Sequence, residues 1–329
     1  MIFHPASPLF ILLTTSSILL AVSSKSWFIA WMSLEINLLS FIPLMALKPN
    51  KYSSETTLKY FLIQAGASSI IILSVNLSFA PQITSPLILL ALLLKAGAAP
   101  FHQWMPSLIE GLSWYPATIL LTVQKLNPLI LISYISNNPY SNKIMYLHIL
   151  FSAAIGSVGG LTQTSLRKIL VFSSITHLSW LLTSITISQP LWLLYFSIYS
   201  LILISLTMIL AKQQSYTLNH ILLKTPLPLS LLSALSLMSL GGLPPFTGFL
   251  PKLMVVQTIS TQNHMFTLIA LLSGTFISLF FYLRMFITHL FLTKTITGPP
   301  PFTLTATHIF ALIINLTGLL IPVLSFILL

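Results

Sequence analysis

Long apolar runs, separated by short polar or Pro- and Gly-containing segments, follow one another along nearly the whole chain. A helix of roughly 20 apolar residues crosses a bilayer core about 30 Å thick. The runs therefore predict about eleven transmembrane helices, two of which are long because each is interrupted. The predicted spans are residues 8–23, 27–47, 57–79, 82–110, 116–135, 144–162, 165–187, 190–212, 226–262, 266–292 and 304–328.

The composition agrees with a membrane location. Hydrophobic residues make up 56% of the 329 residues and charged residues only 5%, whereas soluble domains are about 25% charged. The short loops leave no room for a separate water-exposed domain. We therefore expect an all-α polytopic membrane protein with a single membrane domain over residues 1–329, and we exclude a soluble enzyme, a disordered tail and a disulfide-rich secreted domain.

The basic residues predict the orientation of the chain. There are 14 Lys and Arg residues against three acidic ones, but they come singly or in pairs, unlike the basic patches of nucleic-acid-binding proteins. Basic residues are concentrated in the loops after even-numbered spans, which the positive-inside rule places on the side of synthesis. The N-terminus is then inside and the C-terminus outside. The even-side residues are Lys48, Lys51, Lys59, Arg167, Lys168, Lys212, Lys224 and Lys294, and the odd-side residues are Lys25 and Lys143.

The sequence offers no binding motif for a cofactor. It contains no cysteine, which removes thiolate-held iron–sulfur clusters and zinc sites. Neither a dinucleotide-binding nor a P-loop motif is present, so we expect no cofactor and no metal in this chain. The N-terminus also lacks the basic segment of a secretory or transit peptide, so we expect insertion from the compartment where the chain is made.

Two predicted spans, 82–110 and 226–262, carry helix-breaking residues in their middle. Proline removes a backbone donor and clashes with the preceding turn, and freed backbone groups are tolerated at membrane depth only where protein or a wet cavity satisfies them. A packing kink would explain either break alone. The helix-breaking residues are Gly97, Pro100, Gly241, Gly242, Pro244, Pro245 and Pro251.

The two interrupted spans are the fourth and the ninth. An offset of five spans predicts two inverted repeats, residues 1–135 and 144–292, followed by a terminal helix at 304–328. Interrupted segments at matching positions of two such halves are typical of an ion pathway in a transporter.

Three lysines and one carboxylate are predicted at membrane depth. Lys95 adjoins the first break and Lys252 the second, while Lys125 lies near the middle of the fifth span and Glu35 well inside the second. Arg284 lies late in its span and can reach the inside surface. Charges at depth are usually functional, although a static ion pair remains the alternative.

A proton relay is the function that this set of residues favours. Burial favours the neutral form of a lysine and a nearby carboxylate favours the charged form, so a lysine whose partner moves can gain or lose a proton. Histidines can serve as intermediates, and His177 is the best candidate, followed by His102. Packing is the alternative role for either histidine. Haem is not expected because its ligation needs paired histidines on facing helices.

Four segments then point to a known family. KAGAAPFHQW, VQKLNP, SSITHLSW and SLGGLPPFTGFLPK resemble the antiporter-like chain 2 family of NADH-ubiquinone oxidoreductase, a mitochondrially encoded membrane subunit of respiratory complex I. The resemblance covers essentially the whole chain. It implies an antiporter-like fold shortened by three helices at the N-terminus, in the mitochondrial inner membrane, with the N-terminus on the matrix side and the C-terminus facing the intermembrane space.

The resemblance also implies roles for the buried residues. It assigns a Glu–Lys pair to Glu35 and Lys95, a central lysine to Lys125 and a terminal lysine at a broken helix to Lys252. It implies a translocase subunit that couples NADH oxidation and ubiquinone reduction in other subunits to proton pumping, with FMN, iron–sulfur clusters and ubiquinone held outside this chain. Partners would be the other membrane subunits and lipid, not nucleic acid. A passive structural subunit and a stand-alone cation/proton antiporter remain alternatives.

Overall fold

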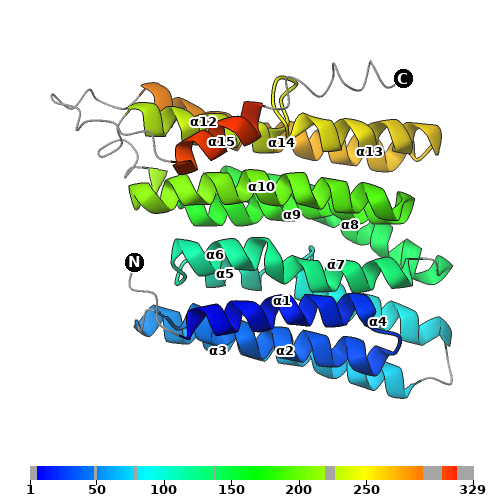
Figure 1. Ribbon diagram of the computed structural model, residues 1–329. Helices are drawn as coiled ribbons and strands as arrows, with labels where there is room; N and C mark the ends of the chain where they lie inside the picture. The colour runs from blue at the N-terminus through cyan, green and yellow to red at the C-terminus, as the bar shows by residue number, and fades with distance from the viewer. Residues whose placement is uncertain are drawn as a thin grey trace. The chain divides into compact units, whose positions relative to one another are not determined.

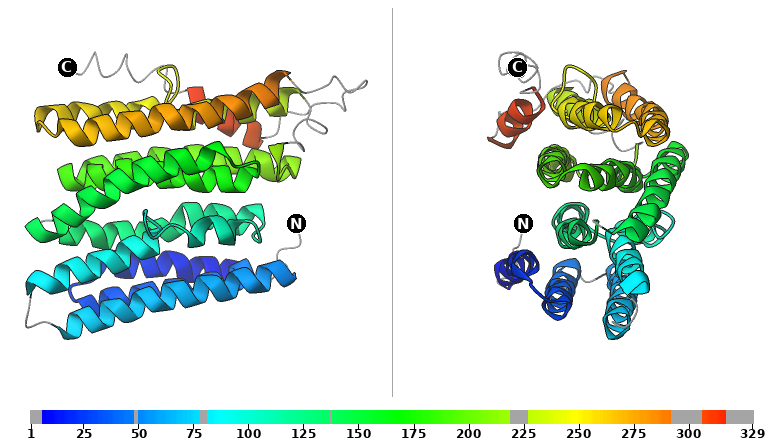
Figure 2. Two further views of the ribbon diagram at one scale, coloured as in Figure 1. Left: turned by 180° about the vertical axis from the view of Figure 1, so that it is seen from behind. Right: turned by 90° about the vertical axis from the view of Figure 1, so that its right-hand side faces the viewer.

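The computed structural model contains α-helices and, among its described residues, one isolated β-bridge between Ser165 and Thr217. It describes residues 6–47, 50–77, 81–136, 138–218, 227–291 and 306–316. The chain divides into two compact units, Met1–His148 and Ile149–Leu329. Within each unit most helix axes are roughly parallel, as their cross-sections in Figure 2 show, whereas α8 and α15 are inclined to them.

The first unit contains the helices that surround the first break (Figure 1). Helices α1, α2, α3 and α4 pack in sequence, and α7 packs against α1, α2 and α4. Its helices are α1 (Ser7–Ser23), α2 (Trp27–Met45), α3 (Lys51–Asn76), α4 (Pro81–Ala96), α5 (Trp104–Ile109), α6 (Trp114–Leu121), α7 (Val123–Ile135) and the first part of α8 (Pro139–Leu161).

The second unit is built around α9, whose residues from Leu166 to Ile185 are all buried except two basic side chains in its first turn. A helix that is buried on every side belongs at the centre of a bundle, and α9 packs against α10, α13 and α14. The helices of this unit are the rest of α8, α9 (Leu166–Ile187), α10 (Gln189–Gln213), α12 (Leu227–Gly241), α13 (Phe249–Thr261), α14 (Met265–Phe291) and α15 (Ala306–Leu316).

Hydroxyl groups account for much of the polar content of these helices. The Ser173 and Ser174 hydroxyls of α9 donate to the carbonyls of Leu170 and Val171, and many other Ser and Thr hydroxyls bond the carbonyl three residues earlier in the same way. A hydroxyl satisfied within its own helix can be buried without a partner helix. This explains how α9 carries so many polar residues at the centre of the unit.

The helices have the length and surface of membrane spans. Among the described residues, seven helical segments are long and apolar enough to cross a membrane, and Ser7–Ser23, Ile83–Ala96 and Leu229–Gly241 are shorter apolar helices. Large apolar side chains are exposed along α14, among them Phe266, Phe276 and Phe280. An apolar surface of this extent needs lipid or a partner protein to cover it.

Each predicted span coincides with one helix or a pair of helices among the described residues. The all-helical prediction is confirmed, and both predicted interruptions are real. The predicted last span is described only as far as Leu316, so its remainder, together with Lys48, Lys224 and Lys294, lies outside the described residues.

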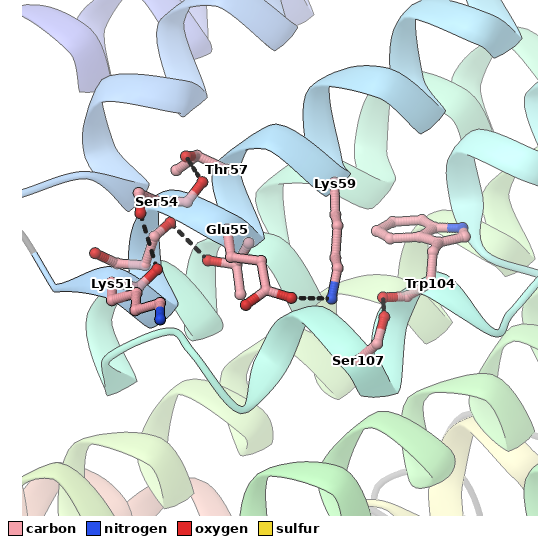
Figure 3. A network of polar contacts seen from close by, with 9 residues as sticks. Lys51, Ser54, Glu55, Thr57, Lys59, Trp104 and Ser107 are labelled. Carbon is pink, nitrogen blue, oxygen red and sulfur yellow. Dashed lines mark hydrogen bonds and ion pairs between the residues drawn. The ribbon is translucent and has the colours of Figure 1, made fainter.

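Two helices begin clearly before the predicted spans, α8 at Pro139, five residues before residue 144, and α3. Helix α3 begins at Lys51, six residues before the predicted span, because a capping box between Asn50 and Ser53 starts it there. Lys59 was expected in a loop, but it lies on α3, where its Nζ is 2.6 Å from Glu55 Oε1, close to α5 (Figure 3). Hydropathy misses such a polar first turn because it marks only the apolar part of a helix.

Candidate functional site

The first break ends α4 in a left-handed turn. Gly97 has a φ of 73°; its amide donates to Leu94 O and the amide of Ala98 to Leu93 O. This pair of bonds is a Schellman motif, which glycine favours because it has no Cβ. Trp104 Nε1 donates to Leu94 O at 3.1 Å, so α5 supplies a donor for the exposed end of α4.

The second break repeats this geometry in the other unit. Gly242 has a φ of 77°; its amide donates to Ser239 O and the amide of Leu243 to Met238 O. The sequence repeats as well, since Gly97–Pro106 and Gly242–Pro251 share the pattern Gly-x-x-Pro-Phe-x-x-aromatic-x-Pro. The two breaks are therefore one local structure that occurs twice.

Lys252 closes the second break. Its Nζ donates to Gly241 O at 2.7 Å and to Leu240 O at 3.4 Å, and the side chain is buried. Carbonyls at the C-terminal end of a helix lack partners in the helix and carry partial negative charge. The carbonyls at the end of α12 thus take the place of the carboxylate that would otherwise have to balance the charge of a buried ammonium group.

Lys95 lies in the last turn of α4, directly before the first break, and is buried. Glu35, half-buried on α2, is close enough to interact with it electrostatically. Among the described residues, the two side chains do not form a direct ion pair. The backbone carbonyl of Lys95 accepts a bond of 3.4 Å from Gln64 Nε2.

Lys125 lies beside a third interruption, which was not expected from the sequence. The fifth span is divided at Thr122 into α6 and α7, so Lys125 occupies the first turn of α7 instead of mid-helix. The Thr122 hydroxyl donates to Thr118 O at 2.7 Å, and such bonds bend helices. Pro128, which cannot donate to the turn before it, was the one signal in the sequence.

A small polar cavity brings two of the predicted residues together. The cavity has a volume of about 20 Å³. This is enough for at least one water molecule. Both Lys95 and Lys125 line it. The other lining residues are Leu34, Asn37, Leu38, Tyr60, Gln64, Trp104, Met105, Leu120, Gln124 and Pro128.

His177 lies at the centre of the second unit, on α9. Its Nδ1 is 2.9 Å from the Tyr195 hydroxyl, and its ring lies 4.9 Å from that of Tyr199. A second cavity, of about 10 Å³, is lined by His177 together with Leu240 and Pro251 at the break. The structure therefore places Glu35, Lys95 and Lys125 in the first unit, and His177 near the Lys252 break in the second.

The surroundings of Arg284 differ from expectation. Arg284 does not extend freely to the surface: it donates from Nη1 to Leu161 O at 2.8 Å and from Nη2 to Gln163 O at 2.6 Å, at the end of α8. His148, on α8, also contacts the first break, because its Nδ1 is 2.7 Å from Ala99 O. His102 is exposed to an intermediate degree beside the same break, with Nδ1 3.2 Å from Pro100 O.

The described part of the chain contains no group of three or more His, Cys, Asp and Glu side chains that could hold a metal ion. The expectation that cofactors lie in other subunits stays a prediction.

Comparison with known proteins gives a consistent family. Residues 24–82 and 76–278 match the family described as NADH:quinone oxidoreductase/Mrp antiporter, transmembrane. NADH-ubiquinone oxidoreductase chain 2 of Anopheles gambiae is 46% identical over 290 residues, covering 84% of each chain. Chain 2 of Elephas maximus is 37% identical over 291 residues, covering 84% of this chain and 83% of that one.

Solved structures have the same fold at lower identity. A chain of respiratory complex I from Thermus thermophilus is 20% identical with a TM-score of 0.81, covering 98% of this chain and 79% of that one. A chain of the archaeal membrane-bound sulfane sulfur reductase gives a TM-score of 0.85 at 14% identity, covering 99% and 75%. The antiporter-like fold is thus confirmed, and the chain belongs to the NADH-ubiquinone oxidoreductase chain 2 family.

Proposed function

We propose that this chain is a proton-translocating, antiporter-like subunit of respiratory complex I in the mitochondrial inner membrane. NADH oxidation and ubiquinone reduction would take place in other subunits, which hold FMN and iron–sulfur clusters. The observation that carries the proposal is that two buried lysines, Lys95 and Lys125, line one small polar cavity.

In the first unit, the proton would pass between these two lysines. Lysine readily changes its protonation state when buried, and opposite charges interact strongly where water is scarce. A change in the distance between Glu35 and Lys95 would therefore change how firmly Lys95 holds its proton. A released proton has a route to Lys125 through the cavity.

In the second unit, His177 and Lys252 would continue the relay. The cavity beside His177 reaches the break that holds Lys252. The helix-breaking residues Gly97, Pro100, Gly241, Gly242, Pro244, Pro245 and Pro251 would serve to expose carbonyl groups at membrane depth. In this unit the proton would be taken up and released by His177 and Lys252.

We further propose that residues 1–135 and 144–292 are inverted repeats, with 304–328 as a terminal helix. The repeated pattern at Gly97–Pro106 and Gly242–Pro251, with the same Schellman bonds, supports this.

Neutralising the relay lysines tests the function. In the assembled complex, we expect Lys125→Gln and Lys252→Gln each to lower NADH-driven quinone reduction and the linked proton uptake by about tenfold or more, equivalent to about 1.4 kcal/mol or more of transition-state stabilisation. Lys143→Gln, which removes an exposed lysine of α8, is the matched control and should leave both rates unchanged.

Assembly is measured beside activity on native gels. Fully assembled complexes with normal coupled activity in both variants would contradict the proposal and favour a passive structural role. The family shared with Mrp antiporters, and a TM-score of 0.78 to a chain of the Mrp complex from Dietzia, make a stand-alone antiporter the second candidate. Sodium-for-proton exchange by the purified chain in liposomes would favour that candidate.

A further inference from the structure

Three neutral polar side chains form a continuous chain of hydrogen bonds along the wall of the Lys95–Lys125 cavity. The Tyr60 hydroxyl donates to Gln124 Oε1 at 3.1 Å, and Gln124 Nε2 donates to Asn37 Oδ1 at 3.0 Å. These residues come from α3, α7 and α2. Gln124 therefore connects both neighbouring helices to the turn that carries Lys125.

Both partners of Gln124 are held in place. Tyr60 is 3% exposed, and its ring packs against Phe41 at 5.3 Å, edge to face, and against Trp104 at 6.2 Å. Asn37 is 4% exposed. Because both partners are buried, the two bonds hold the amide of Gln124 in place between α3 and α2.

The chemistry of the amide suits a role in orienting other groups. An amide side chain has two N–H donors and two acceptor lone pairs, and the contacts to Tyr60 and Asn37 use one of each. One donor and one lone pair remain, and Gln124 lines the cavity beside both lysines. Because an amide does not ionise near neutral pH, it can orient a water molecule there without taking up the proton.

We propose that Gln124 is a positioning residue, which orients the water-sized occupant of this cavity so that a proton can pass between Lys95 and Lys125. This inference rests on the proposed function. It identifies Gln124 as the group that controls the proton transfer between Lys95 and Lys125 in the first unit. Tyr60 and Asn37 act only through Gln124, by fixing the direction of its amide.

The test compares two variants and their combination in the assembled complex. Tyr60→Phe keeps the ring and removes the donor to Gln124, and Gln124→Met keeps the approximate volume and removes both bonds. We expect Tyr60→Phe to lower coupled quinone reduction by about three- to tenfold, the ratio that corresponds to one net hydrogen bond. The solvent deuterium isotope effect on this rate should rise, because proton transfer becomes more strongly rate-limiting.

The double variant separates positioning from simple packing. If Tyr60 acts through Gln124, the rate of Tyr60→Phe/Gln124→Met should equal that of Gln124→Met alone, whereas independent packing effects would multiply. The matched control is Tyr134→Phe in the same unit. The Tyr134 hydroxyl also donates one hydrogen bond, to Val22 O at 3.1 Å, but its side chain is 45% exposed and does not line the cavity.

The Lys125→Gln variant in the same series separates the two proposals. A slow Lys125→Gln complex, together with a Tyr60→Phe complex of normal rate and isotope effect, would overturn the inference and leave the proposed function standing. Multiplicative losses in the double variant would also overturn it. A normal rate for Lys125→Gln would instead contradict the proposed function itself.

Discussion

The buried cations differ in what compensates their charge. Lys252 donates to two carbonyls at the end of α12, while Lys95 lies in the last turn of α4 and interacts with Glu35. Cations are stabilised at helix C-termini. Two of the three deep lysines, Lys95 and Lys252, therefore have a helix C-terminus as a counter-charge, and the one deep carboxylate adds to it at Lys95.

The contact at Gly242 predicts a strong effect of one added methyl group. In Gly242→Ala the new Cβ would lie 2.8 Å from Lys252 Cδ and 2.9 Å from its Nζ, and a non-glycine residue at this positive φ costs about 1–3 kcal/mol. We expect a lower thermal stability of the complex and a loss of coupled activity as Lys252 is displaced.

Gly66→Ala is the control for this substitution. A Cβ at Gly66, on α3, meets nothing within 4 Å, so alanine should be neutral or stabilise the helix by up to about 1 kcal/mol. Equal thermal melts and equal activities for the two variants would contradict the role of the Gly242 turn.

The sequence was informative about single residues where they were chemically unusual. Lysines, one glutamate and clustered Gly and Pro residues are rare at membrane depth, so Lys95, Lys125 and Lys252 could be named in advance. Gln124, Tyr60 and Asn37 could not, because isolated neutral polar residues are common in such spans and only the fold shows which of them meet. The same holds for His148, whose contact with Ala99 O joins residues 49 positions apart.

At the scale of helices, the described structure has one interruption more than the sequence indicated. Gly and Pro clusters mark the ends of α4 and α12, but Thr122 carries no such mark. The break coincides with the hydroxyl bond from Thr122 to Thr118 O, but Thr258 makes the same kind of bond to Met254 O inside the continuous helix α13. A single proline like Pro128 also lies inside the continuous helix α2. Clustered Gly and Pro residues therefore predicted breaks, whereas one threonine and one proline did not.

Arg284 connects two helices. Removing this contact should lower the stability of the complex without lowering its activity. Its two bonds join α14 to the end of α8, and hydrogen bonds to a charged group contribute about 1.5–3 kcal/mol each. We expect Arg284→Gln to lower the melting temperature of the assembled complex, measured by thermal shift, while coupled activity per assembled complex stays normal.

Lys25→Gln, which removes an exposed cation from the first unit, is the control for Arg284→Gln. A normal melting temperature for the Arg284 variant, or a loss of activity without any change in stability, would show that the guanidinium does not act by holding α8 and α14 together.

For the molecule as a whole, hydropathy alone predicted the all-helical fold and the order of the helices that the structure describes. This succeeded because a lipid-covered helix must satisfy its backbone internally and expose apolar side chains, which leaves a clear trace in the sequence. Helix ends that extend beyond the apolar region, as at Lys51, leave no such trace. The boundary between the two compact units, after His148, is visible only in the contacts.

The distribution of loop charges predicts how the whole chain is oriented. We expect an amine reagent that cannot cross membranes to label Lys25 and Lys143 from the outer face of mitoplasts, and Lys51 and Lys212 from the matrix face of inverted vesicles. All four side chains are exposed. Labelled peptides identified by mass spectrometry give the result, and the opposite pattern would reverse the orientation.

The bond between Lys252 and Gly241 O has a consequence for how this cation can be controlled. A backbone carbonyl is a fixed dipole that takes up no proton in the pH range of a cell, so the partner of Lys252 cannot be switched off by titration, as a carboxylate could be. Titration can therefore change this charge only at Lys252 itself. The position of the carbonyl relative to the amine depends on the nine residues, 243–251, that join Gly242 to Lys252.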